Sequence, residues 1–273
     1  MTAQPTGVNA SPRPAGAPIL SVQHIVKVFR NGSEVKAIDD VSFDVNYDEF
    51  ICIIGPSGCG KSTLLRIVAG LEKADSGQVI FRGAPIAKPS PKITMVFQTF
   101  GLLPWKSAME NVELPLEVAG IAKAEAKQRA ERYLRMVGLG GFENAYPHDL
   151  SGGMRQRVGV ARALALGPEV LLLDEPFSAL DELTAKSLRV LLLKIWGDPA
   201  LPTNNFVMVT HNVEEAVMMA DRIIVLSPRP GHVVGELRVP LPRPRFEHLR
   251  DPLFFQTVDK LMGMLSSTTE EQM

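Results

Sequence analysis

Hydrophobic and polar positions form distinct patterns along the first quarter of the chain. Residues 19–29 and 35–45 have strand patterns, and the turn sequence Asn31-Gly32 between them predicts an antiparallel hairpin. Residues 50–54 are continuously apolar, as in a strand that is buried on both faces. A glycine-rich turn follows, and residues 62–70 have helical spacing that ends at Gly70. The predicted order is therefore strand, glycine loop, helix.

The middle of the chain has a different pattern. Helical patterns at 109–119 and 122–137 follow one another with no strand between them, which predicts a helical insertion over about residues 104–150. Helices and strands then alternate, which is typical of an α/β doubly wound core. The helices are expected at 151–166, 182–196 and 213–220, and the strands at 170–173, 206–209 and 222–226.

The two ends of the chain are predicted to lie outside the main domain of residues 19–245. Residues 1–18 are rich in Pro, Ala, Gly and Ser and lack the apolar stretch of a signal peptide, so a disordered tail is expected. Residues 246–273 are expected to form an amphipathic helix and a tail. The apolar stripe of that helix is predicted to consist of Phe254, Phe255, Val258, Leu261, Met262 and Leu265.

Composition excludes several classes of protein. The 273 residues include 29 Lys and Arg against 30 Asp and Glu, and a net charge of −1 gives no field that would capture nucleic acid. Cys52 and Cys59 lack companions at metal-ligand spacing, so neither a disulfide scaffold nor a zinc site is indicated, and a reducing cytosolic compartment is expected. The apolar runs are far shorter than the ~20 residues of a membrane-spanning helix.

The glycine loop carries the first candidate chemistry. Residues 55–62 fit the phosphate-binding pattern, in which inward-pointing backbone N–H groups and a helix N-terminus attract an anion. Lys61 is expected to reach the β- and γ-phosphates, and the Ser62 hydroxyl is expected to bind Mg²⁺. The alternative is a purely structural turn. The predicted nucleotide-binding residues here are Gly55, Pro56, Ser57, Gly58, Cys59, Gly60, Lys61, Ser62 and Thr63.

Polar residues at the ends of two later strands complete a predicted catalytic site. The strand 170–173 leads to Asp174, which is predicted to bind Mg²⁺, and to Glu175, which is predicted to orient or deprotonate the attacking water. His211 follows another strand, at the sheet edge where ligands bind in open α/β folds, and is predicted to contact the γ-phosphate. The alternatives are a helix cap or turn for the acidic pair, and an ordinary surface or core residue for the histidine.

The segment Leu150-Ser-Gly-Gly-Met154, followed by Arg-Gln-Arg, resembles the signature motif of ABC transporter ATP-binding subunits. The resemblance covers nearly all of residues 19–245. It implies an α/β P-loop NTPase core with a mixed sheet, an antiparallel β region at its start and a helical insertion. It also implies that Ser151, Gly152 and Gly153 contact the nucleotide of the opposite subunit, so that a homodimer, or a pair with a related ATPase, holds two ATP molecules.

The resemblance also gives expectations for four individual residues. Met154 departs from the usual Gln, and it is predicted to lie with Val158, Ala161 and Ala165 on the core face of a helix. Gln98 resembles the glutamine that meets Mg²⁺ and reports to the membrane subunit, or else is a polar strand end. Asp181 ends a segment through which paired subunits touch, or caps a helix. Phe29 resembles the aromatic residue that stacks on adenine, or belongs to the core.

Further segments resemble the nitrate, sulfonate, taurine and bicarbonate importers. This implies a peripheral ATPase on the cytoplasmic face of the cell membrane, which couples hydrolysis of ATP to ADP and phosphate to transport through permease subunits. A solute-binding protein would act as an indirect partner, and the solute would be small and anionic. Trp105 is a candidate permease anchor or else a core residue. The segments are 102–105, 174–183, 210–216, 227–231 and 241–245.

Three other functions fit parts of the pattern. A soluble ABC-type ATPase that acts on nucleic acid or the ribosome usually needs coiled-coil arms or two nucleotide domains, and this chain has one set of motifs. A P-loop phosphotransferase has no use for the segment 151–153. A module that binds nucleotide without hydrolysis does not need Glu175 or His211.

Overall fold

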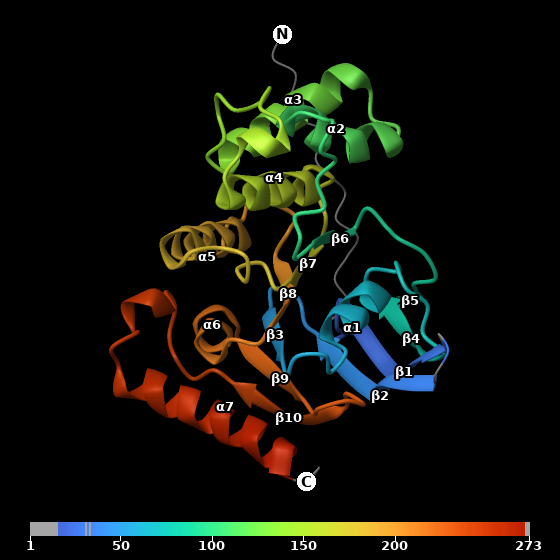
Figure 1. Cartoon of the computed structure of the whole chain (residues 1–273), viewed down its shortest axis with the longest axis vertical. Coiled ribbons are helices and arrows are strands. Elements are labelled where there is room, and N and C mark those ends of the chain that lie inside the picture. Colours follow the sequence, from blue (N-terminus) through green and yellow to red (C-terminus); the bar gives the residue numbers. More distant parts are fainter. Residues whose placement is uncertain (1–15, 31, 33, 271–273) are drawn as a thin grey trace.

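Two β-sheets form the centre of the molecule in the computed structural model, which describes residues 16–30, 32 and 34–270. The smaller sheet has the order β2-β1-β4-β5, and all its pairings are antiparallel. It lies beside α1 at one side of the molecule (Figure 1). Its strands are β1 (Leu20–Arg30), β2 (Glu34–Val45), β4 (Ser76–Phe81) and β5 (Ala84–Pro85).

The larger sheet has the order β10-β9-β3-β8-β7-β6. The five strands from β9 to β6 are parallel, and β10 pairs with β9 in the antiparallel direction. Parallel strands bring their carboxyl ends to the same edge of the sheet. The strands are β3 (Phe50–Ile54), β6 (Ile93–Val96), β7 (Val170–Asp174), β8 (Asn205–Thr210), β9 (Arg222–Leu226) and β10 (Val233–Arg238).

Helices cover this sheet and extend beyond it (Figure 1). The helices α2, α3 and α4 pack against one another at the top of the view, and α7 lies along the opposite end near β10. Ser107 and Glu110 form a reciprocal capping box that begins α2. The helices are α1 (Lys61–Val68), α2 (Ala108–Val118), α3 (Lys123–Met136), α4 (Gly152–Ala165), α5 (Glu182–Trp196), α6 (Val213–Met219) and α7 (Pro252–Glu270), with short 3₁₀ turns at Pro147–Asp149 and Arg245–Glu247.

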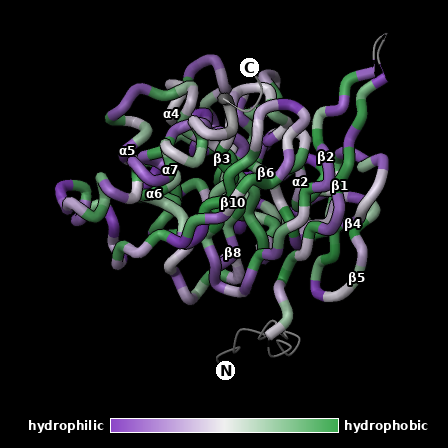
Figure 2. Tube along the Cα trace, turned by 90° about the horizontal axis from the view of Figure 1, so that it is seen from below, coloured by the Kyte–Doolittle hydropathy of each residue, from purple (hydrophilic) through white to green (hydrophobic). Residues whose placement is uncertain are grey.

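The alternation of side chains along β3 divides the core into two layers. Phe50, Cys52 and Ile54 face a cluster formed mainly with the helices α2 to α6, whereas Ile51 and Ile53 face a cluster formed with α1 and the smaller sheet. Successive side chains of a strand point to opposite faces, so a strand between two layers must be apolar throughout. Figure 2 shows the hydrophobic colour concentrated in the central strands.

The predicted fold class is confirmed, but four strands were not predicted. β6 has only four residues and includes the polar Thr94, β5 has two, and the exposed side chains of β4 and β10 weaken their apolar patterns. Most of the predicted tail 1–18 lies outside the described residues, and so does Asn31 of the predicted turn. Within the described part of the chain, no helix has both the length and the apolar character needed to cross a bilayer.

The predicted stripe on the last helix is wrong for two of its residues. Phe254 and Leu261 are buried, but Phe255 is 55% exposed and Met262 is 50% exposed. Thr257 also lies on the buried face. Its hydroxyl donates to the Leu253 carbonyl, so its hydrogen-bonding need is met within the helix. The inner face of α7 therefore follows a narrower stripe than its apolar residues indicate.

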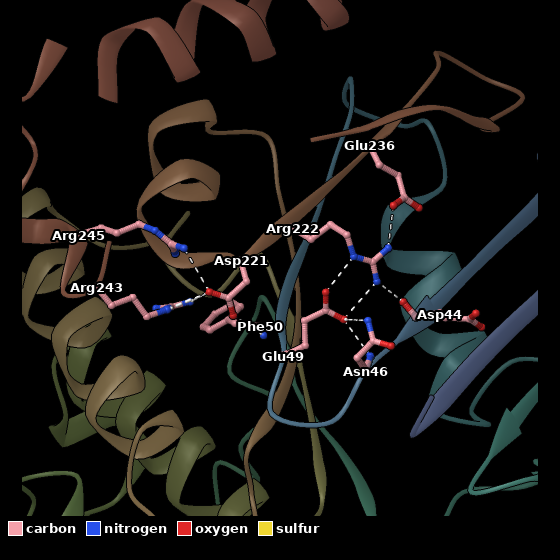
Figure 3. Close-up of polar contacts among 9 residues, drawn as sticks. All are labelled: Asp44, Asn46, Glu49, Phe50, Asp221, Arg222, Glu236, Arg243 and Arg245. Atoms are coloured by element: carbon pink, nitrogen blue, oxygen red, sulfur yellow. Dashed lines mark hydrogen bonds and ion pairs between the residues drawn. The ribbon is translucent and has the colours of Figure 1, made fainter. Parts of the chain in front are cut away.

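Arginine–carboxylate clusters hold the edge of the large sheet at which its parallel strands begin (Figure 3). Arg222, the first residue of β9, donates to Glu49 from Nε at 2.9 Å, to Glu236 from Nη1 at 2.8 Å, and also to the Asp44 carbonyl. The hydrogen bonds with Glu49 raise the pKa of the Arg222 guanidinium. Glu49 also accepts from the backbone N–H of Asn46, so the cluster ties β2, β3, β9 and β10 together.

A second cluster at the same edge attaches the C-terminal segment. The Asp221 carboxylate accepts from Arg243 Nη2 at 2.7 Å and from Arg245 Nη2 at 3.1 Å, and its other oxygen accepts from the Phe50 N–H at 3.1 Å. Burial lowers the pKa of Arg245 to about 10. Arg243 also lies over the Trp196 ring, 4.1 Å from its centroid. The arginines of the segment 241–245 therefore have a structural role at the edge remote from the glycine loop.

Glu49→Ala is expected to lower the free energy of unfolding by about 3 kcal/mol, because it leaves the buried Arg222 guanidinium without its main partner. Urea denaturation measures the change. Glu236→Ala is the matched control, since that side chain is 41% exposed, and we expect a loss of less than about 1 kcal/mol. Equal losses in the two variants would contradict this ranking.

Candidate functional site

The loop between β3 and α1 curls around the carboxyl end of the central strand. Gly58 has a φ of 76° and Gly60 a φ of 106°, which are left-handed conformations that glycine adopts without strain. A Cβ atom at Gly60 would lie 2.9 Å from the Ala37 carbonyl oxygen, so β2 approaches the loop closely there. The first turn of α1 leaves backbone N–H groups at the loop, which suits this place to an anion.

Lys61 is buried beneath this loop, and only 4% of the residue is exposed. Its ammonium group donates to the carbonyl oxygens of Gly55 at 2.7 Å and Pro56 at 2.9 Å. These bonds hold the positive charge inside the curl of the loop.

Ser62 and Asp174 bring two oxygen ligands together. The Ser62 hydroxyl donates to Asp174 Oδ1 at 2.7 Å, and burial raises the pKa of the Asp174 carboxyl group. A hydroxyl and a carboxylate fit Mg²⁺, which prefers hard oxygen ligands and keeps several waters or phosphate oxygens. The described residues contain no group of three or more His, Cys, Asp or Glu side chains that could hold a metal alone. A cation here would therefore complete its coordination with phosphate and water.

Glu175 occupies a strained backbone position beside this pair. Its φ of 43° is in the left-handed region, and its N–H donates to the Val209 carbonyl of β8 at 3.0 Å. Gln98 Nε2 donates to Glu175 Oε2 at 3.3 Å, and His211 Nδ1 lies 3.2 Å from the same oxygen. Gln98 and His211, which were predicted at the ends of β6 and β8, thus both contact the carboxylate of Glu175 at the end of β7.

Residues of the glycine loop and Glu175 line a cavity of about 310 Å³ at the carboxyl edge of the sheet, whereas Gln98, Asp174 and His211 are not among its lining residues. Glu175 and Phe29 lie on its walls, so the structure brings the predicted adenine-stacking residue and the acidic residue to one space. Cys59 is buried and burial raises the pKa of its thiol, which leaves only its backbone for ligand contact. The lining residues are Phe29, Val35, Ala37, Gly58, Gly60, Lys61, Ser62, Thr63, Glu175 and Arg229.

Three lining residues, Val35, Ala37 and Arg229, were not predicted from the sequence. Val35 and Ala37 are two apart on β2, so the strand period could have placed both on one face. Arg229 belongs to the segment 227–231, which was noted only for its resemblance. Its exposed side chain donates from Nε to the Gly58 carbonyl at 3.1 Å.

Two contacts position the loop that carries Arg229. Gly231 N–H donates to the Ala37 carbonyl at 3.0 Å, and a Cβ atom at Gly231 would lie only 2.2 Å from the Cys59 carbonyl oxygen. The Ser227 hydroxyl accepts from the His232 N–H at 3.0 Å. The β9–β10 loop therefore packs on the glycine loop and contributes Arg229 to the lining of the cavity.

The predicted residues Ser151, Gly152, Gly153 and Asp181 do not line this cavity. Ser151 caps α4 by accepting from the Met154 N–H, and a Cβ atom at Gly153 would lie 2.2 Å from Thr184 Cγ2. Asp181 caps α5 by accepting from Thr184 N–H at 3.1 Å, and its hydrogen bonds with Thr184 lower the pKa of its carboxyl group. The starts of α4 and α5 thus pack against each other outside this cavity.

Met154 packs against the main hydrophobic cluster, together with Val158, Ala161 and Ala165 of the same helix. The predicted core role of these side chains is confirmed. The departure from Gln at position 154 thus changes a packing position next to the helix cap.

Trp105 is exposed on a rigid loop between β6 and α2, so the alternative of a core tryptophan is wrong. Its residue is 70% exposed. The buried Asn111 holds the loop, because its Oδ1 accepts from the Leu103 N–H at 2.8 Å and its Nδ2 donates to the Lys106 carbonyl at 2.9 Å.

Comparisons with known proteins agree on a family. Residues 38–178 match a family model described as ABC transporter. The chain is 42% identical to a taurine import ATP-binding protein of Rhizobium johnstonii, over 92% of this chain and 98% of that one. It is 45% identical to a nitrate import ATP-binding protein of Synechococcus elongatus, over 84% of each chain.

A solved structure gives the same result. The dimeric structure of an ATP-binding cassette in a post-hydrolysis state, bound to ADP and Pi, matches 82% of this chain and 100% of that chain. The TM-score is 0.71 and the sequence identity is 34%.

Arg229→Gln is expected to weaken ATP binding about fivefold, because it removes a partly solvated cation from the wall of the phosphate cavity. Titration with a fluorescent ATP analogue measures the dissociation constant, and the difference from the unaltered chain should shrink at high salt. Arg238→Gln is the control, since Arg238 is exposed at the end of β10 and away from this cavity. An unchanged dissociation constant for Arg229→Gln would show that the guanidinium does not act on the nucleotide.

Proposed function

The chain belongs to the ABC transporter family, and from this premise we propose that it is the ATP-hydrolysing subunit of an importer for a small anionic solute. The observation that carries the proposal is the cavity in which Lys61, Ser62 and Glu175 meet at the carboxyl edge of the parallel sheet. ATP is the substrate, and hydrolysis to ADP and phosphate powers transport.

The triphosphate binds in the curl of residues 55–62. Backbone N–H groups and the N-terminus of α1 attract its oxygens, and Lys61 exchanges its two carbonyl partners for the β- and γ-phosphates. Phe29, which also lines the cavity, packs against the adenine base. Ser62 and Asp174 would hold Mg²⁺, which when bound would neutralise charge on the phosphates.

Glu175 orients and deprotonates the attacking water. Its carboxylate is held by Gln98 and lies 3.2 Å from His211, so the three side chains form one unit beside the γ-phosphate position. Phosphoryl transfer depends on positioning and electrostatic stabilisation, and the strained backbone at Glu175 fixes the direction of its side chain. His211 would contact the γ-phosphate, and Gln98 would meet the metal ion.

A second copy completes each site. Ser151, Gly152 and Gly153 lie outside the cavity of their own chain, at a helix N-terminus suited to phosphate. In the proposed head-to-tail homodimer, or in a pair with a related ATPase, they contact the ATP that the partner's phosphate loop holds. Asp181 lies at the contact between the two copies. The dimeric cassette with bound ADP and Pi supports this arrangement.

The loop 103–107 connects the ATPase to the permease. It follows Gln98 and leads into α2, and the hydrogen bonds of Asn111 present Trp105 to solvent. An exposed aromatic residue on a rigid loop is the kind of anchor that fills a pocket in a partner. The subunit would therefore act at the cytoplasmic face of the membrane, with a solute-binding protein delivering the solute to the permease. The names of the taurine and nitrate import relatives support an anionic solute.

Glu175→Gln is expected to retain ATP affinity and to reduce phosphate release at least about 100-fold, because it removes the base and keeps the shape of the side chain. In the presence of ATP this variant should elute as a stable dimer in gel filtration. Lys61→Ala is the control and should lose ATP binding itself. A Glu175→Gln variant with full turnover would refute the catalytic role.

Cysteine crosslinking tests the geometry of that dimer. Ser57→Cys and Gly152→Cys are made in separate Glu175→Gln chains and then mixed, so a disulfide between positions 57 and 152 can only join different molecules. The native thiols do not interfere, since Cys52 and Cys59 are buried and burial raises the pKa of both. We expect a covalent dimer with ATP and none without it.

Trp105→Ala is expected to weaken binding to the permease at least about tenfold, as for loss of a central aromatic anchor. ATP hydrolysis by the isolated subunit should stay unchanged, because Trp105 is not part of the cavity. Co-purification of the intact importer measures the binding. Met262→Ala, on the exposed face of α7, is the matched control and should not affect assembly.

A further inference from the structure

One buried arginine contacts three segments that lead to or from the candidate site. Arg189 lies on α5, and 7% of its side chain is exposed. Its guanidinium donates to the Glu182 carboxylate from Nη2 and to Glu215 Oε1 from Nη1, the latter at 3.2 Å. The guanidinium carbon also lies 5.6 Å from the centroid of the Phe177 ring.

Two of these contacts are next to residues of the proposed mechanism. Phe177 lies two residues after Glu175, in the loop that leads to α5. Glu182 is the first residue of α5 and directly follows its cap, Asp181. The Arg189 guanidinium therefore links Phe177, in the loop after Glu175, to Glu182, which lies beside the proposed subunit contact.

The third contact of Arg189 is with Glu215, which is hydrogen-bonded to the residues on either side of His211. Thr210 Oγ1 donates to Glu215 Oε2 at 2.8 Å, and Asn212 N–H donates to Thr210 Oγ1 at 3.1 Å. Asn212 in turn accepts from the Glu215 N–H at 3.1 Å as the cap of α6. Thr210 is therefore bonded directly to the carboxylate that Arg189 holds, and Asn212 is bonded to Thr210 and to the Glu215 backbone.

Arg189 and Glu215 are both buried, so their charges must stay paired with each other. Burial raises the pKa of the Glu215 carboxyl group, and the positive charge of Arg189 opposes that effect. A buried ion pair tolerates loss of one partner poorly, because the remaining charge is neither hydrated nor paired. Arg189 Nε has no hydrogen-bond partner among the described residues, so the two outer nitrogens make the guanidinium's hydrogen bonds.

We propose that Arg189 is a positioning residue for ATP hydrolysis, which through Phe177, Glu182 and Glu215 keeps Glu175, Asp181 and His211 in a fixed mutual arrangement. This inference rests on the proposed function of the cavity. A change at Asp181 when two subunits close is passed along α5 to Glu215, and from there to the backbone on both sides of His211. Arg189 is not among the residues that line the nucleotide cavity, so it acts through these three residues.

The test compares Arg189→Met with Arg189→Lys in the purified full chain. Arg189→Met keeps the length and apolar packing of the side chain and removes the charge. We expect kcat to fall about 10- to 100-fold while the ATP dissociation constant changes less than about threefold, since misplacement of catalytic groups by about 1 Å has effects of this size. Arg189→Lys should recover part of kcat, because an ammonium can pair with Glu215 but lacks the planar fork that reaches Glu182 as well.

A double variant separates positioning from fold stability. Arg189→Met combined with Glu215→Gln removes the unpaired buried carboxylate, and the amide can still accept from Thr210. The urea midpoint should return toward that of the unaltered chain, while kcat should stay low. Lys186→Met is the matched control, because Lys186 is one turn earlier on α5 and, like Arg189, lines a second cavity that shares no residue with the nucleotide cavity. Its kcat should stay within about twofold.

Two results would overturn this inference. One is an Arg189→Met variant with unchanged kcat, and the other is a double variant in which kcat recovers together with the urea midpoint. Failure of the proposed function gives a different result, since the unaltered chain would then release no phosphate from ATP, or Glu175→Gln would remain active.

Discussion

The parallel hydrogen-bonded register of the central strands is the constraint on which the site depends. Ile54 pairs with Thr210, Asp174 with Val209 and Val96 with Leu173, so the strands β3, β8, β7 and β6 end nearly in step. The residues that follow these ends come from distant parts of the chain and meet at one edge. A slip of one residue would reverse the faces of every side chain in a strand. The two hydrophobic layers prevent that slip, because each face of β3 is matched to its own cluster.

Local features of the site could be predicted from the sequence. The curl at Gly58 and Gly60, and the position of Glu175 after a buried strand, depend on residues close together in the chain, so spacing was sufficient to find them. Short strands were harder, since Ile93–Val96 is too brief to establish a period. The fold class followed from the longer elements, and the missed strands are mostly short or partly exposed.

Contacts between distant segments could not be predicted. Arg229 reaches the cavity only because Gly231 packs against Cys59, which no local pattern indicates. The segment 241–245 was recognised by resemblance, and its structural use in binding Asp221 became visible only in three dimensions (Figure 3). Arginines in this protein hold several segments at once, at Asp221, at Glu49 and at Glu215. A planar group with five donors suits that use, whereas a sequence pattern shows only a charged residue.

The enclosed ammonium of Lys61 has a consequence for ligand discrimination. The group has already given up most of its hydration and depends on two peptide oxygens of its own loop. The free-energy cost of dehydrating the ammonium is therefore already met during folding. An incoming molecule must compete with the two neutral carbonyl acceptors that are already in place. Polyanions win this competition, because an ionised acceptor forms a stronger hydrogen bond than a peptide carbonyl does. Uncharged metabolites gain nothing from displacing the carbonyls, so the loop excludes them thermodynamically, without any steric barrier.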